Sequence, residues 1–217
     1  MFRGSSVEKD SQLATLDLLA SDLIRRALPV RFRLANSFSD LEQVFRLRYH
    51  VAVEKRWIKP EDFPDGIERD AYDERAVHIL ALDDGKVVGT SRLVFPQPGS
   101  CLPTEEVFGL ISKSCEGVAD VGRVCVAPGY RGENYRIFSA LLCRTWIEMR
   151  NRECSRPLAA IAPSGARLYK SWGLKLEILG TPCNHWGEER YPVLISPAES
   201  PVIFAASNLW GKEMERR

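Results

Sequence analysis

The order of elements between Asp120 and Leu142 restricts the folds open to this chain more than any other feature. The segment DVGRVCVAPGYRGENYRIFSALL begins as an apolar strand, turns at Pro128 and Gly129, passes through a basic loop and continues as a helix. A loop between a strand and a helix N-terminus presents several backbone N–H groups to a phosphate. The segment therefore predicts an α/β core with a phosphate-binding loop.

Length and composition indicate one globular domain rather than several. The chain has 217 residues, of which 45% are hydrophobic and 27% charged, as is ordinary for a soluble domain. We expect a helical extension over 1–29, a core over 30–196 and a helical C-terminal segment over 197–217. A net charge of +1 argues against a protein that binds nucleic acid through its overall charge.

Two further features bear on compartment and metal content. No apolar run approaches the roughly 20 residues that span a bilayer, and the first residues, MFRGSSVEKDSQ, lack the pattern of a signal peptide. We therefore expect a cytoplasmic protein that is not an integral membrane protein. The six cysteines form no CxxC pair and are expected as free thiols. Cys183 and His185 are too few for a zinc site, so we expect no metal.

Hydrophobic periodicity gives the elements of the first half. Leucines and alanines recur at three and four residues between 6 and 28, which predicts an amphipathic helix. The segment VRFRLA alternates as a strand, and an S-x-x-E capping box at Ser39 predicts a helix over 39–55. The runs AVHILAL and KVVGTSRLVF, joined through Asp84 and Gly85, predict a β-hairpin. The segments WIKPEDFPDGIERDAYD and PQPGSCLPTEEVFGL are expected as irregular loops.

The second half alternates between strands and helices. The strands are predicted in ADVGRVCVAP, PLAAIA, LKLEILG and RYPVLIS, and the helices follow Arg136 and cover PSGARLYKSWGL. Together with the first half, this order predicts an α/β fold of the α+β kind, a mixed central sheet with helices on both faces.

This order, with VCVAPGYRG at the fourth strand and LYKSWGL near the end, resembles the GCN5-related N-acetyltransferase (GNAT) fold over about 30–196. The resemblance implies a fourth strand that splays from the fifth, with the pantetheine arm of an acyl thioester in the cleft. The backbone groups of Cys125 and Val126 would bind that arm, because an open strand edge pairs with amides. The implied phosphate-binding residues of the loop are Arg131, Gly132, Asn134, Tyr135 and Arg136.

The loop departs from the glycine-rich pattern of this fold. Asn134 and Arg136 stand where glycines are expected, which suits the single phosphodiester of an acyl carrier protein better than the pyrophosphate of coenzyme A. An acyl carrier protein is acidic, and a basic docking face is predicted from five arginines. They are Arg131, Arg136, Arg144, Arg150 and Arg152. Scattered solubilising charge explains these arginines almost as well.

A narrower resemblance lies in FRLRYHVAVEKRW, DAYD, GTSRLV and DVGR, taken in that order. These segments resemble the acyl-homoserine-lactone synthases and their relatives, the N-acyl amino acid synthases and exosortase-associated acyltransferases. The resemblance places the acceptor-binding positions at Arg48, Trp57, Asp70, Asp73, Arg92 and Arg123. The segment CLPTEE favours the N-acyl amino acid synthases. Asp120 replaces the usual glutamate of the family, and Ala52 an aromatic residue.

Amide formation from a thioester needs a base, oxyanion donors and an acid for the leaving thiolate. Asp120 is the candidate base, acting through water, although an ion pair with Arg92 or Arg123 is an equal alternative. A bulge at Gly122 is expected to bring Asp120 and Arg123 to the same cleft. Tyr169 is the candidate donor to the thiolate, and a tyrosine packed at a helix end is the alternative.

Three other candidates complete the site. We expect Arg48, Asp70, Asp73 and Arg92 to form a charge network that holds the long loop over the cleft, with solvated surface charge as the alternative. Trp57 either walls the acceptor pocket or fixes the loop to the core, and His185 lies in a loop that borders this pocket. A covalent role for Cys125 is disfavoured, since no histidine is near it in sequence.

The sequence therefore predicts an N-acyltransferase that moves a fatty acyl group from an acyl carrier protein, or from coenzyme A, to the amine of an amino acid. The thioester is a co-substrate rather than a permanently bound cofactor, and the lipid product would allow peripheral membrane contact. The main alternative is an autoinducer synthase that uses S-adenosylmethionine and forms acyl-homoserine lactones. An acetyl-coenzyme A acetyltransferase and an inactive module that binds acyl carrier protein are further alternatives.

Overall fold

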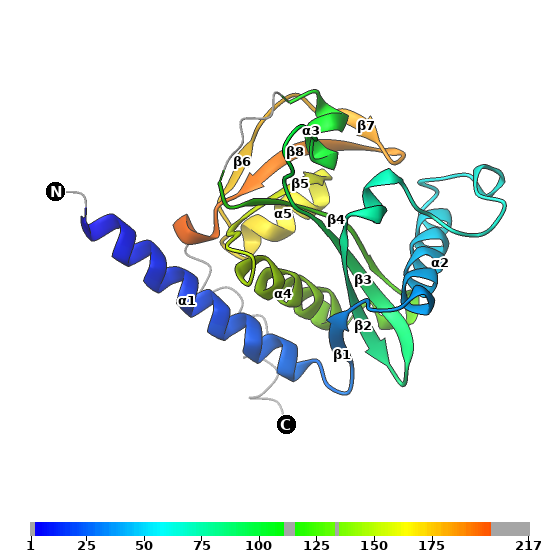
Figure 1. Ribbon diagram of the computed structural model, residues 1–217, viewed down its shortest axis with the longest axis horizontal. Helices are drawn as coiled ribbons and strands as arrows, with labels where there is room; N and C mark the ends of the chain where they lie inside the picture. The colour runs from blue at the N-terminus through cyan, green and yellow to red at the C-terminus, as the bar shows by residue number, and fades with distance from the viewer. Residues whose placement is uncertain (1–2, 111–115, 133–134, 201–217) are drawn as a thin grey trace.

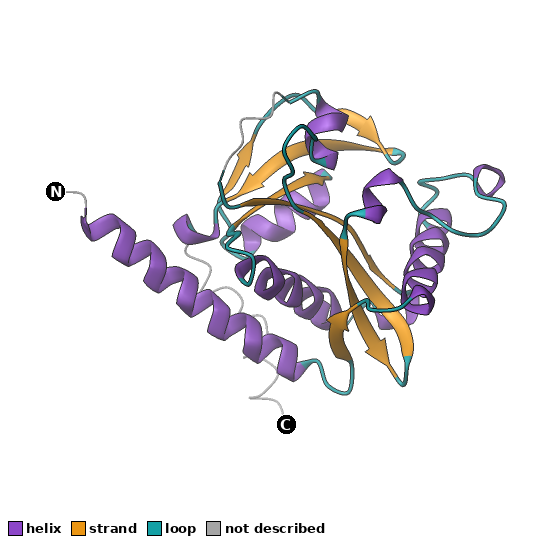
Figure 2. Cartoon of the chain, in the orientation of Figure 1, coloured by secondary structure: helices purple, strands orange, loops and turns teal. Residues whose placement is uncertain are grey.

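The computed structural model of the protein describes residues 3–110, 116–132 and 135–200. Within these residues lie eight strands and five α-helices (Figures 1 and 2). The strands are β1 (Arg31–Leu34), β2 (Val77–Asp83), β3 (Lys86–Val94), β4 (Val118–Val126), β5 (Arg156–Ile161), β6 (Leu176–Ile178), β7 (Cys183–His185) and β8 (Glu188–Ile195). The α-helices are α1 (Arg3–Arg26), α2 (Phe38–Glu54), α3 (Pro103–Phe108), α4 (Arg136–Arg150) and α5 (Pro163–Ser171).

The strands form one mixed sheet with the order β1-β2-β3-β4-β5-β8-β6, and β7 pairs with β8 at one end. Neighbouring strands are antiparallel except β4 and β5, which are parallel. Figure 1 shows α2 and α4 on opposite sides of the sheet, with α1 lying outside α4. The predicted mixed sheet with helices on both faces is therefore confirmed.

The main core lies between the sheet and α4. It contains the fully buried side chains of Ile79, Leu93, Leu141 and Met149. In α4 the apolar residues follow the helical spacing of three and four, so one face of the helix covers β2, β3 and β4. This packing fixes the position of β4, the strand that carries Asp120.

The β2–β3 hairpin has the predicted turn. Asp84 and Gly85 have φ angles of 46° and 76°, the left-handed conformations that a two-residue hairpin turn requires. Glycine meets this requirement without a Cβ clash, and aspartate is among the residues that tolerate it. The sequence pair Asp-Gly therefore sets the first two residue pairs of the hairpin, and a bulge shifts the register between Leu82 and Ala81.

The predicted splay of the fourth strand is also confirmed. β4 pairs with β5 only over three residue pairs, from Val118 with Arg156 to Asp120 with Leu158. From Val121 onwards, β4 has no partner in β5, and its backbone groups on that side face a cavity. Asp120 stands at the point where the two strands separate.

A β-bulge lies on the other side of β4, one residue later than predicted. Gly122 pairs with Arg92 and Cys125 pairs with Thr90, so Ser91 of β3 opposes two residues of β4. The extra residue is Arg123, which has a φ of 51°. The prediction of a bulge at Gly122 is thus wrong in position, although Arg123 does line the same cavity as Asp120.

The N-terminus of α2 differs from the predicted capping box. The N-cap is Ser37, whose side chain accepts a hydrogen bond from the Asp40 N–H (3.1 Å), and Ser39 lies inside the helix. The Asp40 carboxylate also binds Arg33, with distances of 2.6 and 2.8 Å. Ser37 and Ser39 both match a helix-start pattern, and the contacts of Asp40 with Arg33 and with the Asn36 N–H (3.0 Å) favour the earlier start.

This difference gives a simple stability prediction. Ser37→Ala should lower the free energy of unfolding by about 1 kcal/mol, because it removes an acceptor from the first helical turn. Ser39→Ala should change it by less than about 0.5 kcal/mol, since Ser39 caps nothing. Urea unfolding of both variants checks the assignment, and equal losses would contradict it.

Four short elements were not predicted. The segment expected as a second loop contains α3, and the first long loop contains two 3-10 turns, Pro60–Asp62 and Ala71–Glu74. β7 adds a small hairpin to β8. These elements span three to six residues, too few for a hydrophobic period to show. The predicted helical segment over 197–217 falls mostly outside the described residues, apart from a 3-10 turn at Pro197–Glu199. No helix in the described part of the chain is long and apolar enough to cross a bilayer.

Candidate functional site

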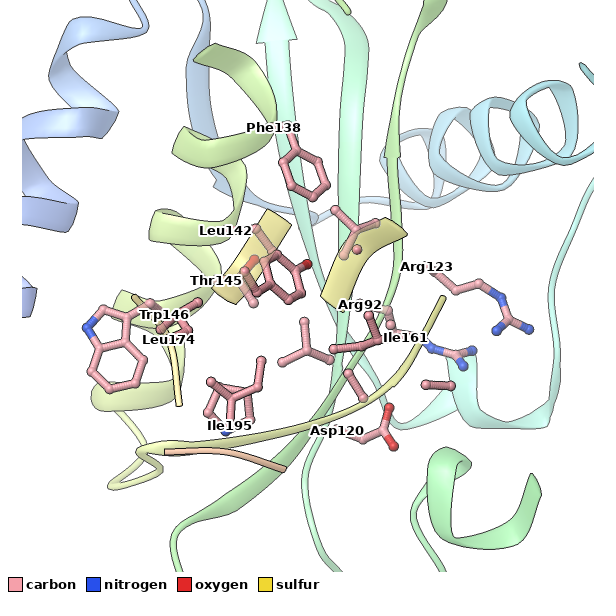
Figure 3. Close-up of a pocket in the computed structure, with 18 of the residues that line it drawn as sticks. Arg92, Asp120, Arg123, Phe138, Leu142, Thr145, Trp146, Ile161, Leu174 and Ile195 are labelled. Carbon is pink, nitrogen blue, oxygen red and sulfur yellow. The ribbon is translucent and has the colours of Figure 1, made fainter. Parts of the chain in front are cut away.

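A cavity of about 480 Å³ opens where β4 leaves β5. Its walls come from β4, β5, α4, α5 and α1, together with the end of β8. One end is polar and contains Arg92, Asp120 and Arg123, whereas Leu142, Trp146 and Leu174 line a long apolar part (Figure 3). A cavity of this size, apolar with a few convergent polar groups, is typical of a small-molecule site.

Three arginines and three carboxylates form a network beside the polar end. The bonds run from Arg48 to Asp73 (2.7 and 3.0 Å) and to Glu68, from Arg92 to Asp70 (2.6 Å) and Asp73 (3.0 Å), and from Arg123 to Glu68 (3.2 Å) and Asp70 (2.9 Å). The predicted network of Arg48, Asp70, Asp73 and Arg92 is confirmed. The alternative of solvated surface charge is excluded, because Arg48 and Arg92 are only 1% and 2% exposed.

The network ties the long loop between α2 and β2 to the sheet. Arg48 comes from α2, Arg92 from β3 and Arg123 from β4, while the three carboxylates come from the loop. The guanidinium of Arg48 holds the pKa of Asp73 well below its usual range, against the opposing effect of burial. Asp70 also caps the Ala71–Glu74 turn by accepting from the Tyr72 N–H (2.9 Å). All six charges are paired, so the network is a rigid and electrically balanced wall of the cavity.

Asp120 lies within the cavity without an arginine partner. Its carboxylate accepts a hydrogen bond from the Thr104 N–H at the start of α3 (2.8 Å), and among the described residues it forms no ion pair with Arg92 or Arg123. Burial raises the pKa of Asp120 to about 6, and the hydrogen bonds from Thr104 oppose this increase only in part. Of the two predicted roles, the geometry favours the base over the structural ion pair.

His185 is another titratable base that lines the cavity, and the Glu188 carboxylate, also in the lining, is paired with Arg190 (2.6 Å). Burial, together with the positive charges of Arg123 and Arg190, lowers the pKa of His185 to about 4. A base is most effective when its pKa is near the working pH. Asp120, with a pKa of about 6, is therefore better suited than His185 to accept a proton near neutral pH.

An aromatic wall closes the polar end. Trp57 and Trp186 meet edge to face with ring centroids 6.3 Å apart. The guanidinium of Arg123 lies 4.1 Å from the Trp186 ring, and that of Arg190 lies 5.0 Å from the Trp57 ring. The turn between β7 and β8 approaches Trp57 so closely that a Cβ at Gly187 would lie 3.3 Å from the Trp57 Cα. Trp57 therefore lines the cavity, as its predicted role in the wall of the acceptor pocket requires, and it also contacts this hairpin.

Tyr169 on α5 lines the cavity, as its candidate role requires. Its ring packs against Trp172 with centroids 5.7 Å apart, and against the apolar cluster around Val193. Burial raises the pKa of Tyr169 to about 12, so its hydroxyl keeps its proton at neutral pH. A neutral phenol at this position can donate a hydrogen bond to a leaving thiolate, and the packed position that we considered as the alternative is compatible with this role.

The role of Tyr169 has a direct test. Tyr169→Phe should lower kcat about tenfold. This loss is smaller than the usual effect of removing an acid–base group, because a thiolate is a good leaving group. The loss should be smaller for a thioester with a more acidic thiol. The free energy of unfolding should change little, because the phenylalanine ring keeps the contact with Trp172. A kcat equal to that of the wild type would assign Tyr169 a packing role only.

The donor-binding residues are only partly as expected. The Ala127 N–H donates to Val88 (2.8 Å), and strand alternation then turns the backbone groups of Cys125 towards β3 as well. Val126 alone of the predicted pair faces the open edge, where its carbonyl accepts from Arg131 Nε (2.7 Å). The expectation that Cys125 offers its backbone to pantetheine is therefore wrong, because an antiparallel strand directs alternate residues to opposite neighbours.

The loop residues have mixed roles. Gly132 has a φ of 116°, and Tyr135 begins α4 with a φ of 63° and a half-exposed ring. Arg136 Nη1 donates to the carbonyls of Ala27 (3.1 Å) and Leu28 (3.2 Å), just after α1. Asn134 lies outside the described residues. In the described part of the loop, the N–H groups of Tyr130, Arg131 and Tyr135 donate to carbonyls of the loop itself, and Arg136 joins the loop to α1, so phosphate binding by the loop stays a prediction.

The five arginines of the predicted docking face have partners in the fold. Four of them form ion pairs, namely Arg131 with Glu54 (2.7 Å), Arg144 with Glu148 (3.0 Å), Arg150 with Asp17 (3.3 Å) and Arg152 with Glu148. Arg136 binds the two carbonyls described above. This pairing reduces the positive charge available to an acidic partner.

The cysteines in the described part of the chain offer no obvious nucleophile. The described ones, Cys101, Cys125, Cys143, Cys154 and Cys183, are free thiols. Burial raises the pKa of Cys125 to about 11, which disfavours the thiolate, and Cys125 is not among the residues that line the cavity. Direct attack on the thioester is thus favoured over an acyl-enzyme. The described residues contain no group of three His, Cys, Asp or Glu side chains placed to hold a metal ion.

Sequence reasoning missed four residues of the site. Glu68 pairs with Arg48 and Arg123, and Thr104 binds Asp120. Trp186 belongs to the aromatic wall, and Arg190 packs on the Trp57 ring of that wall. Glu68 is one of several acids in an irregular loop, and nothing local distinguishes it from its neighbours. Trp186 precedes a glycine between two short alternating segments, a hairpin signal that would have placed both it and Arg190 near His185.

Comparison with known proteins agrees with this fold. Residues 43–187 match the family of the N-acyl amino acid synthase FeeM. The structure superposes on a CoA-dependent acyl-homoserine lactone synthase, MesI, with a TM-score of 0.64 and 26% identity, covering 83% of this chain and 95% of that one. It superposes on FeeM from uncultured soil microbes with a TM-score of 0.62 and 11% identity, covering 78% and 92% of the two chains.

Two curated relatives match parts of the chain. An isovaleryl-homoserine lactone synthase of Bradyrhizobium diazoefficiens is 50% identical over 54 residues, which cover 24% of this chain and 25% of the relative. An L-ornithine N(alpha)-acyltransferase of Rhizobium meliloti is 30% identical over 128 residues, which cover 52% of this chain and 43% of the relative. The matches thus span less than half of each relative. Because the family match covers more than half of its residues, this chain belongs to the family of the N-acyl amino acid synthase FeeM.

Proposed function

We propose that this protein is an N-acyltransferase that transfers a fatty acyl group from a thioester to the amine of an amino acid. The observation that carries this proposal is one continuous cavity with a base, Asp120, at its polar end and a long apolar part beyond it. A base next to charged groups suits an amino acid, and an apolar tunnel suits a hydrocarbon chain. Family membership and the partial match to an ornithine acyltransferase support the same reaction class.

The proposed reaction is direct attack. The pantetheine arm lies along the open edge of β4, beyond Asp120, where backbone groups are free to bind its amides. The acceptor nitrogen attacks the thioester carbonyl, a C–N bond forms, and Asp120 takes the proton of the amine through a water molecule. The C–S bond then breaks, and Tyr169 donates a hydrogen bond or proton to the leaving sulfur. Direct attack requires no acyl-enzyme, in keeping with the inert environment of Cys125.

The amino acid acceptor would lie between the charge network and the aromatic wall. Its carboxylate can bind Arg123 or Arg190, both of which line the cavity, and its amine would then be directed at Asp120. Arg190 pairs with the Glu188 carboxylate (2.6 Å), and its Nε is buried with no hydrogen-bond partner among the residues that the structure describes. A carboxylate ligand would satisfy that donor. Arg48, Arg92, Asp70 and Asp73 would then position Arg123 and the loop rather than bind the acceptor directly.

The donor is an acyl thioester of an acyl carrier protein or of coenzyme A. Both carry the same pantetheine arm, so the open edge of β4 serves either one. The loop sequence favours the carrier protein, whereas the paired arginines of the docking face favour coenzyme A. Since both thioesters are made in the cytoplasm, we place the reaction there.

Expression in a bacterium gives the first test. The lipid extract should contain N-acyl amino acids that are absent from cells expressing Asp120→Asn, and their masses would identify both substrates. A matched control is Asp83→Asn. Asp83 is the last residue of β2, and its carboxylate accepts a hydrogen bond from the Tyr130 hydroxyl (2.6 Å). Identical extracts from wild-type and Asp120→Asn cells would contradict the proposal.

The second candidate function is acyl-homoserine lactone synthesis from S-adenosylmethionine. The observation that favours it is the 50% identity to an isovaleryl-homoserine lactone synthase over 54 residues. The aromatic wall of Trp57 and Trp186 would suit a sulfonium cation as well as it suits an amino acid. Acyl-homoserine lactones in the same extracts, in place of N-acyl amino acids, would select this candidate.

A further inference from the structure

The far end of the cavity is built by α1, a helix that precedes the residues matched by the family. The α1 side chains that line it are Leu16, Leu19, Ala20 and Leu23, spaced along one face of the helix. Across from them stand apolar side chains of α4, among them Leu142 and Trp146. This part of the cavity contains little that could bind a polar ligand.

The position of α1 is fixed along its length. The Trp146 Nε1–H donates to Asp17 (2.7 Å), and Lys9 pairs with Glu199 near the helix start (3.0 Å). Beyond the helix end, Arg136 donates to the carbonyls of Ala27 and Leu28. These contacts join α1 to both ends of α4 and to the turn that follows β8. The helix α1 is therefore a defined wall rather than a loosely attached extension.

The α1 wall is remote from the reacting centre. In Figure 3, Arg92 and Arg123 lie on one side of the view, while Trp146 and Leu174 lie on the other, beside α1. An acyl chain whose carbonyl is near Asp120 would run past Leu142 and end against α1. The residues at that end would contact the terminal methyl group and not the thioester.

This inference rests on the proposed function: we propose that α1 sets the length of the acyl chain that the cavity accepts. A cavity of about 480 Å³ is about three times the roughly 150 Å³ that holds one benzene molecule, so it is larger than an acetyl group requires. Acetyl and branched five-carbon chains would leave most of the apolar part empty. Ala20, the smallest side chain of the α1 wall, determines where the chain stops.

The test is a ladder of binding affinities. The purified protein is titrated with S-acyl-pantetheine thioesters from hexanoyl to hexadecanoyl, without acceptor. Affinity should rise about fourfold per carbon, the equivalent of about 0.8 kcal/mol per buried methylene, until the chain meets α1. Ala20→Phe should move that limit to chains shorter by about three carbons, because the added ring fills roughly 100 Å³. Leu19→Ala, at a half-buried position, should move it by one or two carbons in the opposite direction.

The control is Leu18→Phe, on the same helix at a position that is 74% exposed and outside the cavity. This variant should keep the wild-type limit. An unchanged limit in both Ala20→Phe and Leu19→Ala would overturn the proposal, and an affinity that does not depend on chain length in the wild type would do the same. If Ala20→Phe fails to fold because the site is overpacked, Leu19→Ala alone decides the outcome.

This design separates the failure of the inference from the failure of the proposed function. A chain-length limit that shifts with α1, in a protein that makes no N-acyl amino acids, would retain the acyl-length role and reject the acceptor. N-acyl amino acid synthesis with a limit that α1 does not move would retain the reaction and reject the role of α1.

Discussion

Replacing Asp120 with asparagine should lower kcat/KM for acyl transfer by about 10²–10⁴-fold, the usual contribution of a general base, which corresponds to about 3–5 kcal/mol. The asparagine side chain can still accept the hydrogen bond from the Thr104 N–H, so the geometry of α3 and the cavity is retained. The loss therefore reports on proton transfer. The measurement is steady-state kinetics with a long-chain thioester and an amino acid.

The pH dependence of the wild type follows from the same residue. Burial raises the pKa of Asp120 to about 6, and only the ionised carboxylate accepts a proton. On the acidic side of the pH profile, activity should therefore fall about tenfold for each pH unit below pH 6. Above pH 6 this carboxylate is ionised and should cause no further change. Asp120→Asn should lose this limb. A wild-type limb near pH 4 would instead assign the base to a group with the pKa of His185.

Asp120→Asn should also stabilise the protein at neutral pH. The pKa of Asp120 is about 6 when folded and near 3.9 when unfolded. Between those values the native state binds more protons than the unfolded state, so its stability falls as pH rises from 4 to 6 and the loss persists above. The full difference is about 3 kcal/mol. Urea unfolding at pH 7.5 should show a more stable and inactive variant, whereas retained activity would remove Asp120 from the mechanism.

Replacing Arg48 with methionine should lower the free energy of unfolding by about 3 kcal/mol. Arg48 is 1% exposed and forms hydrogen bonds with Glu68 and Asp73, so its loss leaves two buried carboxylates with fewer partners. Breaking a buried ion pair on one side typically costs about 3–5 kcal/mol. Arg123 and Arg92 remain to bind the two carboxylates, which places the expected loss at the low end. Denaturant unfolding at pH 7 measures it.

The matched control is Arg46→Met, two residues away on the same helix. Arg46 pairs with Glu42 at the surface (2.8 Å), with both side chains at least 40% exposed. Such a pair contributes about 0–1 kcal/mol. Arg48→Met should also raise the pKa of Asp73, so its stability deficit should shrink as the pH is lowered and that carboxyl becomes protonated. Similar losses in the two variants would show that the buried network does not stabilise the loop.

Local patterns in the sequence were sufficient for most of the fold. The Asp84–Gly85 turn, the periodicity of α4 and the strand-loop-helix order after Asp120 each depend on chemistry within a few residues. The bulge was misplaced because Gly122 is the residue most tolerant of a positive φ, yet Arg123 adopts it. The ion pairs of Arg123 with Glu68 and Asp70 lie across the fold and favour that conformation, which no local pattern shows.

The candidate site was predictable in its charged half and not in its apolar half. The segments that resemble the acyl-homoserine-lactone synthases and their relatives contain Arg48, Asp70, Asp73 and Arg92. The structure brings these four charged residues together. The contribution of α1 to the cavity depends on how a remote helix packs on α4 through Asp17 and Trp146. The alternation of Cys125 and Val126 depends on the register of β3 with β4. Both are tertiary properties, which a single sequence does not specify locally.

The central claim is that the cavity joins a fatty acyl thioester to an amino acid, and mass spectrometry of a defined reaction tests it most directly. Purified protein is incubated with a dodecanoyl thioester, a mixture of the amino acids and S-adenosylmethionine. We predict release of the free thiol together with an N-dodecanoyl amino acid, and neither product with Asp120→Asn. Acyl-homoserine lactone as the product, or no thiol release from the wild type, would contradict the claim.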